Sequence, residues 1–193
     1  GAAGNDQLDG GDGLDVASFA APRLHSTLQW VGPGCTVTTP QDGSDQLTGI
    51  ERLMFTDGNL ALDLDGHAGT VARVIGALFG PALLANPDYV GIGLAAVDKG
   101  LDCAGLVSMA LGTEAFAQLA GSHSHTDFVK LVYRNVVGTA PTPDELAAYV
   151  ALLDNGSQTQ VSLAVMACDT AANIAHIDLA GLAGTGLDYT LFL

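Results

Sequence analysis

Positive charge is scarce in this sequence. Only 6 of the 193 residues are Lys or Arg, against 21 Asp and Glu, and the formal net charge is −15. This balance excludes a general surface for nucleic acids or anionic membranes, because both attract basic residues. Glutamate is scarce as well, with only Glu51, Glu114 and Glu145. The acidity therefore comes from Asp, the acidic residue of tight turns and of calcium loops.

Cysteine and long apolar runs are also in short supply. Cys35, Cys103 and Cys168 lie far apart and form no CxxC motif, which argues against a zinc knuckle or a thioredoxin-like site. Cys103 and Cys168 fall within apolar helical patterns, where we expect inert, buried side chains. Charges or glycines interrupt every apolar run before it reaches the length of a membrane span, so we expect no membrane insertion. No N-terminal secretory signal is visible.

Glycine and aspartate, by contrast, crowd the first fifteen residues, "GAAGNDQLDGGDGLD". Divided into nines, residues 1–9 and 10–18 follow the template G-G-x-G-x-D-x-U-x, in which U is a large apolar residue. The first copy departs from it only at Ala2, and the second has Ala17 where the apolar residue belongs. Because the chain begins inside the motif, we expect these residues to be the end of a longer array.

The two nonapeptides resemble the RTX (haemolysin-type) repeat, a parallel β-roll that binds calcium. Glycine turns expose backbone carbonyls and Asp adds charge, which together suit a cation that takes about six to eight oxygen ligands. In such a roll a complete site needs loops two nonapeptides apart, so Asp6 needs a loop before Gly1 or one near Leu24, where the sequence has no such loop. We therefore expect incomplete sites unless another loop contributes. An unmetalled Gly/Asp linker is the alternative. The resemblance implies Ca2+ as the cofactor, with a first set of ligand residues comprising Gly4, Asp6, Gly11, Asp12, Gly13 and Asp15.

The segment that follows reads as β structure. Two β-rich runs, 27–31 and 35–39, flank Gly32-Pro33-Gly34 and predict a hairpin. The sequence "DGSDQLTGIERLMFTDG" (42–58) then resembles the segment that closes RTX arrays. Within it, Asp42 and Asp45 either complete a calcium half-site left by the final nonapeptide or cap a tight turn, and the sequence leaves both interpretations open.

From His67 onward the apolar period changes from two residues to nearly four, which predicts helices. The pattern then recurs: Pro87-Asp88 matches Pro143-Asp144, and the first copy has two extra residues just before this pair. We therefore expect two copies of one helical unit, about 67–121 and 125–180, sharing one core. The apolar matches between the copies are Val71, Val74, Leu78, Phe79 and Gly80 with Val129, Val132, Val136, Val137 and Gly138.

The second copy resembles the bacterial DUF4214 family over "FVKLVYRNVVGTAPTPDELAAYVALLDNG" (128–156), although Thr139 replaces the usual Arg. That family often occurs in tandem and near RTX repeats in large exported proteins. Its function is not established, so the resemblance implies a context rather than an activity.

No catalytic constellation stands out. The stretch "GSHSHTD" (121–127) carries Ser, His and Asp, but we expect a linker in which Thr126 or Asp127 caps the next helix. No G-x-S-x-G motif is present, and Glu51 lacks a partner carboxylate for acid–base chemistry. His67 and His176 are expected at helix ends in structural roles. We therefore expect no enzyme.

These observations predict an α+β fold. Residues 1–66 should form the end of a calcium β-roll with a β-hairpin cap, residues 67–185 an all-helical domain of two tandem repeats, and 186–193 a tail. The function expected is that of a non-enzymatic, calcium-binding C-terminal module of a secreted bacterial protein, which the RTX resemblance connects with type I export.

Two alternative functions remain open. One is an adhesin- or S-layer-like module that binds a cell-surface or self-assembly partner through the helical repeats. The other is an accessory domain of a secreted hydrolase whose catalytic domain lies upstream. All three functions imply an extracellular or cell-surface location, and the scarcity of basic residues predicts no binding of nucleic acid.

Overall fold

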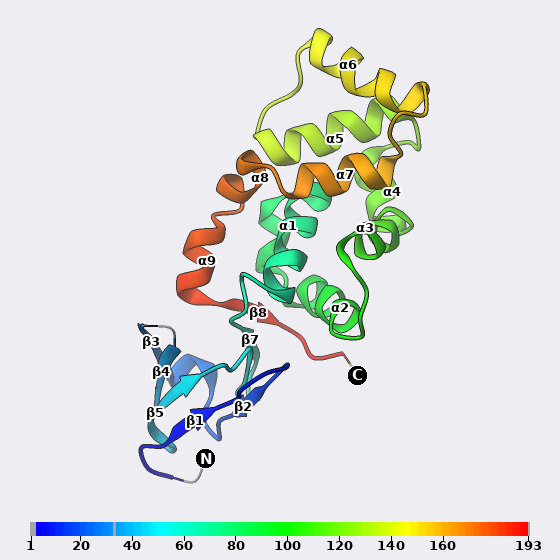
Figure 1. Cartoon of the computed structure of the whole chain (residues 1–193). Helices are drawn as coiled ribbons and strands as arrows, with labels where there is room; N and C mark the ends of the chain where they lie inside the picture. The colour runs from blue at the N-terminus through cyan, green and yellow to red at the C-terminus, as the bar shows by residue number, and fades with distance from the viewer. Residues whose placement is uncertain (1–2, 33, 193) are drawn as a thin grey trace.

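The chain is a mixed α/β structure, with its strands gathered at one end and its helices at the other (Figure 1). The computed structural model describes residues 3–32 and 34–192, so Gly1 and Ala2 of the first nonapeptide, and Pro33 of the hairpin turn, lie outside the described residues. The strands are β1 (Gln7–Asp9), β2 (Val16–Ser18), β3 (Thr27–Val31), β4 (Gly34–Thr39), β5 (Gly43–Thr48), β6 (Arg52–Met54), β7 (Asn59–Ala61) and β8 (Leu187–Tyr189).

The described strands form two four-stranded sheets, ordered β1-β5-β4-β3 and β2-β6-β7-β8. β1 pairs in parallel with β5, and β2 pairs in parallel with β6. Residues 7–18 therefore form one rung, and residues 43–54 form a second rung beside it. Apolar side chains from both sheets meet in one cluster: Ala17, Phe19, Cys35, Val37, Leu47, Leu53, Phe55 and Leu60.

The loop around Asp6 contacts a segment much further along the chain than the two nonapeptides that separate paired loops in a regular roll. The Asp6 amide donates to Asp45 Oδ1 at 2.9 Å, 39 residues further along the chain. No calcium loop lies near Leu24, as the sequence indicated, because residues 19–42 leave the rung and contain the β3–β4 hairpin. That hairpin is confirmed, with Leu28 opposite Val37. Strand β5 was missed, because its first residues were interpreted as a calcium loop or turn.

The helices are α1 (His67–Phe79), α2 (Pro87–Val97), α3 (Cys103–Leu111), α4 (Glu114–Ala120), α5 (His125–Val137), α6 (Pro143–Asp154), α7 (Gln160–Cys168), α8 (Ala171–His176) and α9 (Leu179–Thr185), with 3-10 turns at Arg23–His25 (η1) and Pro81–Ala85 (η2). Short polar side chains begin most of them by accepting a backbone N–H, as expected of N-caps. Ser124 caps α5, so the prediction of Thr126 or Asp127 was wrong. Ser124 has the extended backbone that an N-cap needs, whereas both predicted residues already lie inside the helix.

The helical core is centred on α1, which packs on α5, while α3 packs on α7 (Figure 1). Val74 and Leu78 of α1 and Val132 and Val136 of α5 are buried, as the repeat pattern predicted. Val137, however, is 44% exposed, so its predicted burial was wrong. It is the last residue of α5 and lies at a surface groove described below.

The last strand returns to the β end of the molecule. β8 pairs antiparallel with β7, Leu60 opposite Asp188, although the sequence analysis placed no strand in residues 186–193. The Thr190 amide also donates to the carbonyl of Pro87 at the start of α2, so this segment contacts both parts of the chain. Over the described residues, no single helix is long and apolar enough to cross a membrane; α3 and α4 pass that test only as a pair, bent by 70°.

Candidate functional site

The residues predicted to bind calcium fall into two groups, one at the start of the paired strands β1 and β5 and one in the link between β1 and β2. In the first group, Gly4 and Asp6, just before β1, lie beside Asp42, just before β5, and Asp45, within β5. The Gly4 amide donates to the Asp42 carbonyl at 2.9 Å, and the Asp6 amide donates to the Asp45 carboxylate. Four of the predicted residues are therefore brought together by parallel stacking.

This stacking explains why the second loop needs glycine. Gly43 has φ +93°, and a Cβ built on it would lie 2.1 Å from the carbonyl oxygen of Gly4. Any side chain there would separate the two loops, so Gly43 permits the close approach of their backbones.

The carboxylate of Asp42 is already used within the protein. Its Oδ2 accepts hydrogen bonds from the Ala20 amide at 3.1 Å and from Thr39 Oγ1 at 3.0 Å. In return, Thr39 Oγ1 accepts from the Asp42 amide at 2.8 Å. These bonds are typical of a capped turn, which is the alternative to a calcium ligand that the sequence left open for Asp42.

The second group lies between β1 and β2, where residues 10–15 pass beside the shorter link 49–51 of the next rung. The Asp15 amide donates to Glu51 Oε2 at 2.8 Å, and the Asp15 carbonyl accepts from the amides of Glu51 and Arg52. Asp12 is exposed, between Gly11 and Gly13, both of which have positive φ. Glu51 thus supports the neighbouring loop, a role that the sequence analysis did not find.

Two carboxylate oxygens in these loops, Asp6 Oδ2 and Asp15 Oδ2, are buried and have no hydrogen-bond partner among residues 3–32 and 34–192. Among the described residues, no group of three or more His, Cys, Asp or Glu side chains is placed to hold a metal ion. A cation at either loop would therefore rely on a single orphaned carboxylate oxygen together with the carbonyls of the glycine turns. Such an oxygen-only set is chemically suited to calcium rather than to zinc.

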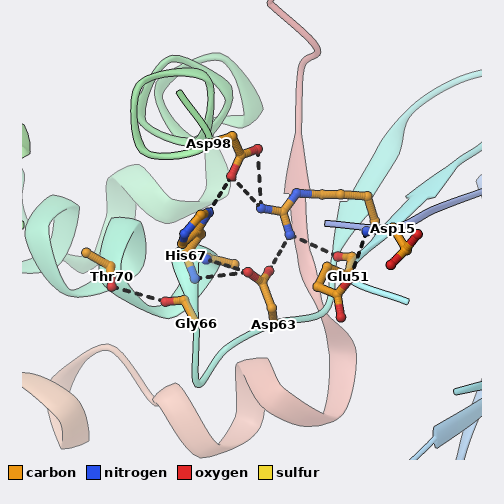
Figure 2. A network of polar contacts seen from close by, with 9 residues as sticks. Asp15, Glu51, Asp63, Gly66, His67, Thr70 and Asp98 are labelled. Atoms are coloured by element: carbon orange, nitrogen blue, oxygen red, sulfur yellow. Dashed lines mark hydrogen bonds and ion pairs between the residues drawn. The ribbon is translucent and has the colours of Figure 1, made fainter. Parts of the chain in front are cut away.

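A buried arginine joins the β part to the helices, and sequence reasoning missed this site. Arg52 of β6 is 2% exposed and forms ion pairs with Asp63, in the link to α1, and with Asp98, the C-cap of α2. His67 joins the network through Nδ1, 2.7 Å from Asp98 Oδ1, and its amide donates to Asp63 Oδ2 (Figure 2). One guanidinium thus connects β6 with the link that precedes α1 and with the end of α2.

A second His–Asp pair occurs in the other half of the helical part. His125 Nδ1 lies 2.7 Å from Asp154 Oδ1, the same distance as in the His67–Asp98 pair. In each pair the His is the first residue of a 13-residue helix, and the Asp lies at the end of the next α-helix. The His125 side chain therefore contacts Asp154 and links the start of α5 to the end of α6.

The "GSHSHTD" stretch behaves as a helix start. Ser122 Oγ donates to Asp127 Oδ2 at 2.6 Å, and this bond, with a weaker one from Ser124, lowers the pKa of Asp127. Ser124 Oγ accepts from the Asp127 amide. These contacts fix the first turn of α5.

The surface of the helical part is hollowed by an apolar groove of about 340 Å³. Its polar edge is a Tyr133–Glu145 hydrogen bond of 2.7 Å, and Glu145 also accepts from the amide of Thr142 in a capping box. Tyr149 and Met166 at the groove are 39% and 57% exposed. The groove lies among α5, α6, α7 and α8 and is lined by Phe128, Val129, Val132, Tyr133, Val136, Val137, Glu145, Tyr149, Leu163, Met166, Ala167, Thr170 and Ala172.

Comparison with known proteins gives one match. The family described as Domain of unknown function (DUF4214) matches residues 107–176, from within α3 to the end of α8. Residues 107–176 form a DUF4214 domain. This domain contains the whole apolar groove and most of the predicted second helical copy, whereas the β part and residues 67–106 lie outside it. No curated protein and no solved structure matched the chain.

Proposed function

We propose that this chain is a non-enzymatic, calcium-binding module of a secreted bacterial protein, whose stacked loops become ordered around calcium outside the cell. The observation that carries the proposal is the pairing of Asp6 with Asp45 on adjacent rungs, with Asp6 Oδ2 buried and unpartnered. An unsatisfied buried carboxylate oxygen is costly, and a bound cation would remove that cost. The RTX resemblance of the same residues connects the module with type I export.

Each loop pair would contribute differently. At the first, Asp6 supplies the unpartnered oxygen, while the Asp45 carboxylate is 1% exposed and holds the Asp6 amide in place. At the second, Asp15 supplies the unpartnered oxygen, and Glu51 holds its amide. Calcium would supply the positive charge that these acidic loops lack. Asp42, through its bonds to Thr39 and Ala20, keeps the first loop turned.

We also propose that residues 67–121 and 125–180 are two tandem copies of one helical unit. Helices α1 to α4 have 13, 11, 9 and 7 residues, and α5 to α8 have 13, 12, 9 and 6. Thr113 and Thr170 cap α4 and α8, and each donates its hydroxyl to the carbonyl three residues earlier. The two His–Asp pairs add a second matched feature.

Calcium is expected to raise the melting temperature of the chain. A ligand that binds only the folded state stabilises it by about 2.7 kcal/mol when its concentration is a hundred times its Kd. For a chain of this size, each kcal/mol corresponds to roughly 2–4 °C. Calorimetry with calcium, and with magnesium as the competing cation, measures this shift.

The variant Asp6→Asn should lose most of the calcium response, because it removes the unpartnered anionic oxygen. Asp144→Asn removes the same charge from α6, at the opposite end of the molecule (Figure 1), and should keep the full response. An unshifted melting temperature in the wild type, or equal responses in the two variants, would contradict the proposal.

The apolar groove favours a second candidate function, assembly with another copy of this chain. In the first copy, Phe79 packs against Tyr89 with ring centroids 5.8 Å apart. The repeat alignment replaces these two residues by Val137 and Glu145, which leaves the groove open in the second copy. The exposed Met166 at its edge is a flexible apolar side chain of the kind that fills irregular gaps.

Under this candidate function, sedimentation velocity should show association that increases with protein concentration. Met166→Glu should abolish it. Met109→Glu is the matched control, because Met109 occupies the equivalent position of α3 and is also exposed, and it should leave association intact. A wild-type chain that stays monomeric at high concentration would rule out this assembly.

A further inference from the structure

Two cysteines that are distant in sequence meet between α3 and α7. Cys103 is the first residue of α3, and Cys168 is the last residue of α7. The two helices pack against each other, Cys103 packs against the apolar core that contains Cys168, and each thiol shifts the pKa of the other. Cys168 is fully buried, whereas Cys103 is partly exposed. Both residues were expected to be inert and buried, because nothing in their spacing shows that these helix ends meet.

The surroundings of the two thiols differ. The thiol of Cys168 lowers the pKa of Cys103 to about 7, and burial and the nearby Asp residues oppose this only in part. The position of Cys103 at a helix N-terminus also favours a thiolate. The pKa of Cys168 is raised, first by the thiol of Cys103 and then by burial. Cys103 thus has the features of an attacking thiol, and Cys168 those of a resolving thiol.

We propose that Cys103 and Cys168 form a reversible disulfide, and that the oxidant is a small-molecule disulfide. The Cys103 thiolate attacks one sulfur of the oxidant, forming a mixed disulfide and releasing one thiolate. Cys168 gives its proton to the thiolate released in the first step, and its sulfur attacks Cys103 Sγ, forming the protein disulfide and releasing a second thiolate. The protein loses two protons and two electrons, and the oxidant is reduced to two thiols.

This bond would join the two halves of the helical part. Cys103 lies just outside the DUF4214 domain and Cys168 lies within it, so the link would close a long loop of chain. Closing such a loop restricts the unfolded chain and therefore favours the folded state. For a chain of this length, we expect oxidation to raise the melting temperature by roughly 5–15 °C.

Cys35 provides an internal control. It is buried in the separate cluster between the two sheets, and burial raises its pKa. It should therefore remain a free thiol under conditions that oxidise the other pair.

The test treats the full chain with oxidised glutathione and then maps its thiols by mass spectrometry. The expected product has lost two hydrogens, contains a Cys103–Cys168 cross-link, and keeps one free thiol, Cys35. Dithiothreitol should restore three free thiols and reverse the rise in melting temperature. Cys35→Ser should behave as the wild type does.

The single variants separate the two roles. Cys168→Ser should accumulate a glutathione adduct on Cys103, because the resolving thiol is missing, whereas Cys103→Ser should react far more slowly. The rate of the wild-type reaction should rise between pH 6 and pH 8, as Cys103 ionises around its pKa of about 7. A wild-type chain that keeps three free thiols, or that accumulates the mixed disulfide without the cross-link, would overturn the proposal.

Discussion

Replacing Arg52 by Met is expected to lower the free energy of unfolding by about 3–5 kcal/mol, because it removes the buried guanidinium that pairs with two partly shielded carboxylates. Methionine fills much of the space of the arginine stem but cannot pair with Asp63 or Asp98. The side chains of these two acids are only 11% and 22% exposed, so water compensates the loss poorly. Urea denaturation followed by circular dichroism measures the change.

The matched control is Arg73→Met, which breaks the ion pair between Arg73 of α1 and Asp169. Arg73 lies 3.2 Å from Asp169, but the Asp169 side chain is 66% exposed. An exposed pair of this kind contributes about 1 kcal/mol or less. Equal losses for the two variants would show that Arg52 is not the buried link between the β part and the helices.

Phe128→Ala is expected to destabilise the protein by about 3–5 kcal/mol, the range for removing a large aromatic side chain from a core. Phe128 of α5 is 1% exposed, and its ring lies 6.3 Å from that of Phe116. Phe116 belongs to α4, so Phe128 fills the space between the two proposed helical copies. Its removal leaves a cavity that neighbouring helices cannot easily close.

Val137→Ala on the same helix supplies the comparison. Val137 is 44% exposed, and a surface substitution of this kind usually changes stability by about 0.5 kcal/mol or less. Both changes shorten a side chain on α5, so helix propensity does not account for a large difference between them. If Phe128→Ala cost no more than Val137→Ala, the shared helical core would be contradicted.

Local patterns predicted the helices well, because their signals lie within a few residues. The structure begins α2 at Pro87, α3 after Asp102 and α4 after Thr113, and each of these is a residue type that favours a helix N-terminus. The β part was harder, because its parallel pairs join residues far apart. Nothing near Asp6 indicates that Asp45 is its neighbour, and nothing in "GLDYTLFL" shows that this segment completes a sheet with β7.

The acidic loops could be located from the sequence, whereas the ion-pair network around Arg52 could not. The glycine and aspartate spacing located two loops, and the structure brings Gly4, Asp6, Asp42 and Asp45 together. The ion-pair network was missed because it depends on residues from three separate segments. One signal was available, since Arg52 is one of only six Lys or Arg residues and lies inside a predicted strand region. A cation there needs buried acidic partners, but the sequence does not identify them.

Hydrogen exchange with and without calcium tests most directly the claim that the acidic loops become ordered around calcium. Asp6, Asp12 and Asp15 repel one another and the glycines raise the entropic cost of ordering, so these loops should be loosely held without a cation. Calcium should slow exchange in residues 4–15 and 42–49, while residues 128–153 in the helical part stay unchanged. Equal protection of the loops with and without calcium would contradict the account, leaving those aspartates as residues of solvated, capped turns.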